Sequence, residues 1–170
     1  MPISFEIEQT IHYPAVQTFT FLSDLSNMPL WNYYIQSVTK TTAGPIGINT
    51  LYEQKRPHDR HFIKIIDYQP FESMTAALQP PGPAHQFSFI LTNMGEHTKV
   101  VYKWIVYLEH YIWMKYIPSE KLKQWLLSFA ERHILSRIRS AVEQNFFTLK
   151  LLLENGHVTL QDGRPITLPE

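Results

Sequence analysis

The spacing of apolar residues has a period of two over most of the chain and a period of 3.6 near the C-terminal end. From Ile3 to Thr10, apolar and polar residues alternate, which predicts a strand with one buried face. Pro14 then suits the first turn of a helix, and a second short helix or turn is predicted to end at Trp31. Six further strands are predicted at Tyr33–Thr42, Thr50–Arg56, Arg60–Tyr68, Glu72–Gln79, Ala84–Asn93 and Thr98–Leu108.

A single long helix is predicted from Ser119 to Asn155. Ser119 is a suitable N-cap, and Asn155-Gly156 is a suitable C-terminal stop. Its apolar stripe comprises Leu127, Ala130, Ile134, Ile138, Ala141, Leu149 and Leu152. Seven strands followed by one long helix indicate an α+β domain rather than alternating βαβ units. A sheet that wraps around such a helix tends to leave a cavity between the two.

The segment after this helix is expected to be a tail or a small hairpin, because Asp162-Gly163 separates two short apolar stretches. We therefore expect one domain over residues 1–156 and an appendage over residues 157–170. A length of 170 residues is typical of one domain with a sizeable core.

Composition narrows the possible functions. Aromatic residues make up 14% of the chain, which suits a large core or an aromatic-lined pocket. The net charge of zero gives no sign of a nucleic-acid binder. The absence of cysteine excludes disulfides and thiol nucleophiles. No apolar run is long enough to span a membrane and the N-terminus does not resemble a secretory signal, so a cytoplasmic location is expected.

Several stretches, in their order and spacing, resemble a known family. They are Ile11–Ala15 with Phe19–Asp24, Asn27–Trp31, Gly44–Gly47, Ile65–Pro70 and Asn145–Glu154. From Ser4 to Gly156 the chain is similar to the START-like (SRPBCC) superfamily of polyketide cyclase/dehydrase and lipid-transport proteins. The resemblance implies the helix-grip fold, in which a seven-stranded antiparallel sheet wraps around a long C-terminal helix and two short helices follow the first strand. The chain departs from the pattern at Asn49, where a glycine is common.

The helix-grip fold would place a ligand cavity between the sheet and the long helix. On the last predicted strand the lysines mark the face that is exposed to water, so the opposite face, with Tyr102 and Trp104, points to the interior. On the strand before it, alternation with polar residues likewise points Phe87 and Phe89 to the interior. The resemblance adds two further aromatic residues from the N-terminal part of the chain. The expected ligand-binding residues are Trp31, Tyr52, Phe87, Phe89, Tyr102, Trp104, Ile134, Ile138 and Asn145. The Asn145 amide lies on the helix stripe and needs a polar partner, which is either a neighbouring part of the protein or a ligand.

Catalytic and metal-binding signals are weak. The densest polar cluster, His58–His61, falls in a predicted hairpin turn, where exposed polar groups need no function, and no third metal ligand is indicated. Glu53, Asp67 and His133 would be acids or bases only if they faced the cavity. We therefore predict no catalytic residue, no metal and no cofactor.

Three functional hypotheses follow from these observations. The first is a carrier or binder of a hydrophobic small molecule such as a lipid, polyketide, sterol or quinone-like compound. The second is an enzyme of the cyclase/dehydratase kind. The third is a protein-interaction module that uses the apolar segment from Tyr111 to Phe129. This segment can also be buried in the monomer, or form a pocket lid, a homodimer interface or a membrane-touching edge.

Overall fold

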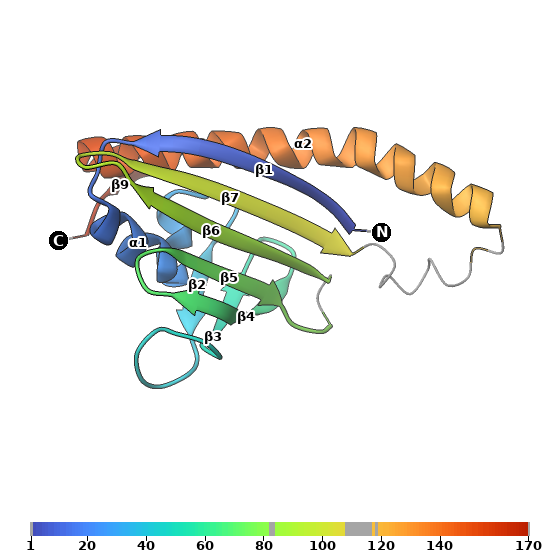
Figure 1. Cartoon of the computed structure of the whole chain (residues 1–170), viewed down its shortest axis with the longest axis horizontal. Helices are drawn as coiled ribbons and strands as arrows, with labels where there is room; N and C mark the ends of the chain where they lie inside the picture. The colour runs from blue at the N-terminus through green and yellow to red at the C-terminus, as the bar shows by residue number, and fades with distance from the viewer. Residues whose placement is uncertain (1, 82–83, 108–116, 118, 170) are drawn as a thin grey trace.

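One antiparallel sheet and one long helix make up most of the molecule (Figure 1). A computed structural model describes residues 2–81, 84–107, 117 and 119–169, without the side chains at positions 123, 127 and 130–134. The sheet has seven strands in the order β1, β7, β6, β5, β4, β3 and β2, and all its neighbouring strands are antiparallel. Its strands are β1 (Pro2–Ile11), β2 (Ser37–Lys40), β3 (Leu51–Lys55), β4 (Arg60–Gln69), β5 (Ser73–Leu78), β6 (His85–Asn93) and β7 (Thr98–Tyr107).

Two short helices follow β1, and the long helix follows β7. The short helices are α1 (Ala15–Ser23) and a 3-10 helix, η1 (Leu25–Leu30). The long helix, α2 (Glu120–Asn155), runs unbroken for about 50 Å at ~1.5 Å per residue. It lies beside β1 and covers one face of the sheet, while its N-terminal end extends beyond the strands (Figure 1). This is the helix-grip architecture that the sequence predicts.

Both ends of α2 lie where the sequence predicts them. The Ser119 hydroxyl accepts a hydrogen bond from the Leu122 amide at 3.4 Å, which satisfies one of the otherwise unpaired amides of the first turn. At the other end Gly156 has a φ of 77°, a left-handed conformation that costs a glycine little. Its amide donates to the Leu152 carbonyl at 2.9 Å and so closes the helix.

The alternation of strand residues determines which face of the sheet is buried. On β7, Val100, Tyr102 and Val106 are buried toward the helix, whereas Lys99 and Lys103 form ion pairs with glutamates of β1 on the outer face. Phe87, Phe89 and Leu91 on β6 are buried by the same alternation. The inward face of the sheet is therefore largely apolar along β6 and β7.

Phe146 on α2 is the centre of the packed core. Its ring is fully buried and lies 5.0 Å from Tyr102, 5.6 Å from Trp31 and 6.2 Å from Phe89, measured between ring centroids. Leu149 and Leu152 continue this contact toward the helix C-terminus. The C-terminal half of α2 thus packs directly against the sheet.

Two local expectations change in the structure. The strand predicted at Tyr33–Thr42 is shorter, because the Asn32 side chain accepts a hydrogen bond from the Tyr34 amide at 3.1 Å and holds Tyr33 and Tyr34 in a bent segment. Asn49, which stands where the family has a glycine, has a φ of 71°. Asparagine tolerates this left-handed conformation, so the turn forms without glycine.

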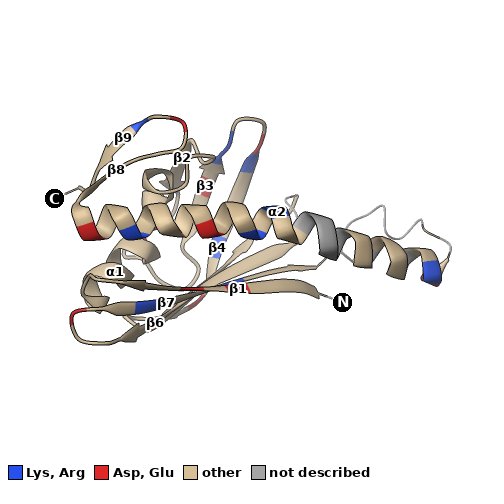
Figure 2. Ribbon diagram, turned by 90° about the horizontal axis from the view of Figure 1, so that it is seen from above, with Lys and Arg blue, Asp and Glu red and all other residues tan. Residues whose placement is uncertain are grey.

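The segment after α2 forms a small hairpin of β8 (His157–Thr159) and β9 (Pro165–Thr167). It lies beside the C-terminal end of α2, as the view from above shows (Figure 2). Leu160 is buried, and the Arg164 guanidinium donates to the Tyr33 carbonyl at 3.2 Å. The hairpin is therefore attached to the bent segment that precedes β2.

Part of the apolar segment Tyr111–Phe129 lies outside the described residues. Within its described part, Leu122, Trp125 and Phe129 are exposed on α2, so these three side chains are not buried in the monomer. The rings of Trp125 and Phe129 stack at 5.8 Å. None of the described helices combines the length and the apolar character needed to cross a membrane.

Candidate functional site

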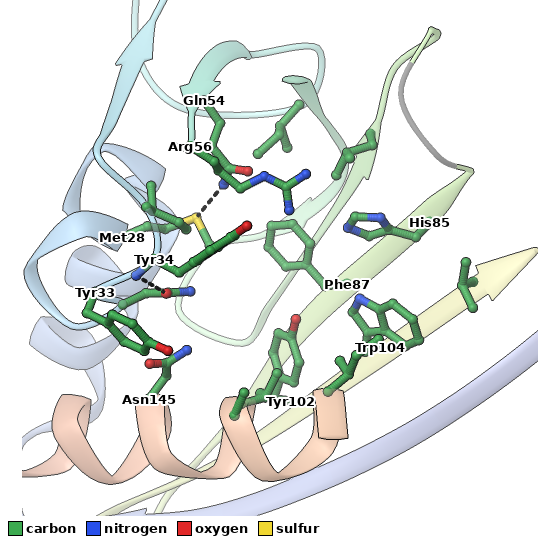
Figure 3. A pocket seen from close by; sticks show the side chains of 18 of the residues that line it. Met28, Tyr33, Tyr34, Gln54, Arg56, His85, Phe87, Tyr102, Trp104 and Asn145 are labelled. Carbon is green, nitrogen blue, oxygen red and sulfur yellow. Dashed lines mark hydrogen bonds between the residues drawn. The ribbon is translucent and has the colours of Figure 1, made fainter. Parts of the chain in front are cut away.

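A cavity of about 620 Å³ lies between the sheet and α2 (Figure 3). Along α2 it lies on the N-terminal side of Phe146, whose ring fills the space between helix and sheet. Helix residues Leu135, Ile138, Ala141, Val142 and Asn145 form one wall. The other walls are formed by Ile3, Met28, Asn32, Tyr33, Tyr34, Ile35, Gln54, Arg56, Ile63, Leu78, His85, Phe87, Tyr102, Trp104 and Val106.

The predicted ligand-binding residues divide into two groups. Five of them line the cavity: Phe87, Tyr102, Trp104, Ile138 and Asn145. Three are buried in the core and are not part of its wall: Trp31, Tyr52 and Phe89. For Ile134, the side chain lies outside the described residues.

Aromatic rings form the floor of the cavity. The Phe87 and Tyr102 rings are stacked at 6.1 Å, and the Trp104 ring stacks on Phe5 of β1 at 5.3 Å. Phe5, Trp104 and Phe87 are opposite one another in the register of β1, β7 and β6, and Tyr102 is two residues before Trp104 on the same face of β7, so the sheet itself determines their positions. The result is a rigid, concave apolar surface, which is typical of small-molecule sites.

A polar cluster occupies the end of the cavity beside β3 and β4. Arg56 donates from Nε and Nη2 to the two carboxylate oxygens of Asp59, at 2.7 and 2.8 Å. These bonds hold the pKa of the Asp59 carboxyl below its usual range. The Arg56 guanidinium also contacts His61 Nε2, which lies 3.2 Å from Asp59 Oδ2. His61 Nδ1 is buried and has no hydrogen-bond partner among the described residues.

The buried position of His61 corrects the expectation that the His58–His61 cluster is an exposed turn. His61 pairs with Gln54 across β3 and β4 and points to the same side as Ile63, so the sheet turns it inward. His58 is exposed, as expected. Among the described residues, no three histidine, aspartate or glutamate side chains lie close enough together to hold a metal ion.

His85 at the start of β6 is a cavity-lining group whose pKa is lowered by its surroundings. Its ring lies 5.7 Å from Trp104 and points into the cavity toward Arg56 (Figure 3). Burial, and after it the nearby Arg56 and His61, together lower the pKa of His85 from 6.5 to about 4. The ring is therefore neutral at pH 7.

Two further polar groups face the cavity from the other side. Asn145 is buried on α2, yet its amide forms no hydrogen bond with any described residue, which leaves it available to a ligand or water. Tyr102 is buried beneath it, and its hydroxyl points into the cavity (Figure 3). Burial raises the pKa of the Tyr102 phenol, so the hydroxyl remains protonated and can donate.

The sequence interpretation missed Gln54, Arg56 and His85. The signal was present in the period of two: Gln54 and Arg56 are two and four residues after Tyr52, and His85 is two residues before Phe87. Since Tyr52 and Phe87 were assigned to the interior, these polar residues belong to the same face.

The three acid–base candidates from the sequence are not among the residues that line the cavity. Glu53 pairs with Arg60 at 3.2 Å, and Asp67 is exposed beside a bulge in β4. The His133 side chain lies outside the described residues.

No protein-family model matches the sequence, and no curated protein matches it significantly. Solved structures do share its fold. XoxI from Bacillus cereus has a TM-score of 0.62 at 10% identity, over 88% of this chain and 94% of that one. The di-domain ARO/CYC BexL from the BE-7585A biosynthetic pathway has a TM-score of 0.61 at 11% identity, over 88% of this chain and 47% of that one. Ara h 8.0201 has a TM-score of 0.52 at 14% identity, over 88% of this chain and 99% of that one.

At identities this low the likeness concerns the fold alone. The chain has the α+β helix-grip fold of these proteins, with the seven-stranded sheet and long C-terminal helix that the sequence predicts. It spans about half of the di-domain BexL chain. What these proteins bind or catalyse is not carried over by the shared fold.

Proposed function

We propose that the protein binds a hydrophobic small molecule in the cavity between the sheet and α2. The observation that carries the proposal is a cavity of about 620 Å³ whose walls are mostly aliphatic and aromatic. This size falls within the roughly 300–1,000 Å³ that is usual for small-molecule sites. Apolar burial would supply most of the affinity: ~200 Å² of ligand surface removed from water contributes about 5 kcal/mol at ~25 cal/mol per Å².

The residues proposed to contact the ligand are those that border the cavity. Phe87, Tyr102 and Trp104 would pack against it from the sheet, and Ile138 from the helix. The Asn145 amide would orient a polar group of the ligand, since it has no other partner among the described residues. Trp31 and Phe89 would act indirectly, by holding Phe146 and Tyr102 in place.

Native mass spectrometry of the purified protein tests this proposal. A co-purified hydrophobic compound is expected as a mass excess that disappears on denaturation. In parallel, titration with Nile red, an uncharged fluorescent probe, should show saturable binding at one site. Ala141→Trp, which adds a large ring at the cavity wall, should abolish this binding, whereas Ser140→Trp on an exposed, non-lining position of the same helix should not. Equal Nile red binding by the two variants would refute the proposal.

His85 provides the observation that favours a second candidate, an enzyme of the cyclase/dehydratase kind. It is an inward-facing titratable side chain, which such an enzyme needs as an acid or base. However, a base with a pKa of about 4 is poorly matched to reactions near pH 7, where catalysis favours a pKa close to the working pH. Binding is therefore the better supported function. Conversion of a bound compound that His85→Gln abolishes without weakening binding would favour the enzyme.

A further inference from the structure

The end of the cavity beside β3 combines one permanent positive charge with an excess of hydrogen-bond donors. Among the described lining residues, Arg56 is the only permanently charged side chain, and no aspartate or glutamate lines the cavity. The Arg56 side chain is largely buried, with 25% of its surface exposed to solvent. A charge in such a site is screened less than one on the open surface.

Only some of the N–H groups of the Arg56 guanidinium form hydrogen bonds to described residues. Its Nε and Nη2 atoms bond to the more exposed Asp59, and Nη2 also bonds to His61. Its Nη1 atom makes no hydrogen bond to any described residue. In the close-up view the guanidinium points into the cavity, toward His85 and Phe87 (Figure 3). Asp59 therefore fixes the orientation of the arginine while leaving one pair of N–H groups for a ligand.

Further donors surround this position. The Trp104 indole N–H and the Tyr102 hydroxyl both belong to cavity-lining side chains, and neither has an acceptor among the described residues. Near Arg56, His61 Nδ1 is also buried without a hydrogen-bond partner among the described residues. Indole can only donate, and guanidinium can only donate, so a ligand must supply the acceptors.

We propose that this end of the cavity recognises a carboxylate carried by an otherwise hydrophobic ligand, with Arg56 Nη1 as the principal donor. The inference rests on the proposed function and specifies the ligand class. A carboxylate offers only acceptors and one negative charge, which matches a guanidinium that shares its charge with Asp59. A phosphate dianion would require a second cation, and the described lining contains none. The hydrocarbon part would lie between Trp104 and Ile138.

Calorimetric titration with three ligands of equal chain length tests the inference. Dodecanoate, dodecanol and dodecyl phosphate are compared at pH 8 and below their micelle concentrations, on the wild type, Arg56→Gln and Arg60→Gln. Arg60 is the matched control because it also carries one charge near β3, but its side chain is 67% exposed and pairs with Glu53 outside the cavity. The wild-type ligand comparison does not depend on any variant folding.

We expect the wild type to bind dodecanoate about tenfold more tightly than dodecanol, a difference of about 1.4 kcal/mol. Arg56→Gln should remove this preference, so that dodecanoate and dodecanol bind with similar affinity, and Arg60→Gln should keep the preference. Equal wild-type affinity for dodecanoate and dodecanol would overturn the inference but leave the proposed function intact. Tighter binding of dodecyl phosphate, or a preference that survives in Arg56→Gln, would overturn it as well. Failure of all three ligands, together with Nile red, would overturn the proposed function itself.

Discussion

His85 is expected to make the protein less stable as the pH falls from 7.5 to 5. Its folded-state pKa is lowered from 6.5 to about 4, first by burial and then by Arg56 and His61. In the unfolded chain the ring recovers its ordinary proton affinity, so between these two pKa values the unfolded state binds the additional proton. The free energy of unfolding is therefore highest above pH 6.5, where the ring is neutral in both states, and it decreases as the pH falls toward 4.

The magnitude follows from the two pKa values. A tenfold difference in proton affinity between the folded and unfolded states is worth ~1.36 kcal/mol, so the gap from 6.5 to about 4 corresponds to roughly 3 kcal/mol once the ring is protonated in both states. At pH 5, where the folded protein still keeps the ring neutral, about 2 kcal/mol of this has been lost. At pH 7.5 the contribution of the titration is close to zero.

Urea unfolding followed by tryptophan fluorescence at pH 7.5, 6 and 5 measures this effect. Other titrating groups also change stability with pH, so the comparison is between the wild type and His85→Gln, which cannot titrate at this position. The wild type should lose about 2 kcal/mol more than His85→Gln between pH 7.5 and 5. His58→Gln, at an exposed histidine, should behave as the wild type does. Parallel pH dependences for the wild type and His85→Gln would show that the ring is not held neutral, and would refute the reasoning.

Three further predictions concern the helix that grips the sheet. Phe146→Ala should lower the free energy of unfolding by about 3–5 kcal/mol, since the ring is fully buried, and a loss below ~1 kcal/mol in urea unfolding would contradict its central place in the core. Asn145→Leu should cost less than ~1 kcal/mol, because its amide has no partner among the described residues, and a larger loss in the same assay would reveal a hydrogen bond. Gly156→Ala should lower the free energy of unfolding by about 1–2 kcal/mol in thermal unfolding, because Gly156 has a positive φ. The control Gly47→Ala, at a glycine in open space without a positive φ, should change it by less than ~1 kcal/mol, and equal effects of the two substitutions would contradict this explanation.

The direction of many strand side chains was available from the sequence. A strand places successive residues on opposite faces, so Phe87 and Tyr102 could be assigned to the interior from their neighbours alone. The same rule applied to Tyr52 would have predicted that Arg56 points inward, although its charge argued for solvent. The ends of α2 were likewise predicted from Ser119 and Gly156, because capping depends on local backbone geometry and hydrogen bonds.

The distance between the two layers was decided only by the tertiary structure. Periodicity shows that Phe89 and Trp104 face the helix, but it does not show that Phe146 fills the space beside Phe89 while a cavity remains beside Trp104. Phe146 thus separates the closed core from the cavity. The fold of the sheet brings Arg56, which follows β3, and His85 of β6 to the same cavity, although they are far apart in the sequence and β3 and β6 are not neighbours. Local sequence encodes which way a side chain points, whereas the void between layers depends on how all the packed side chains fit together.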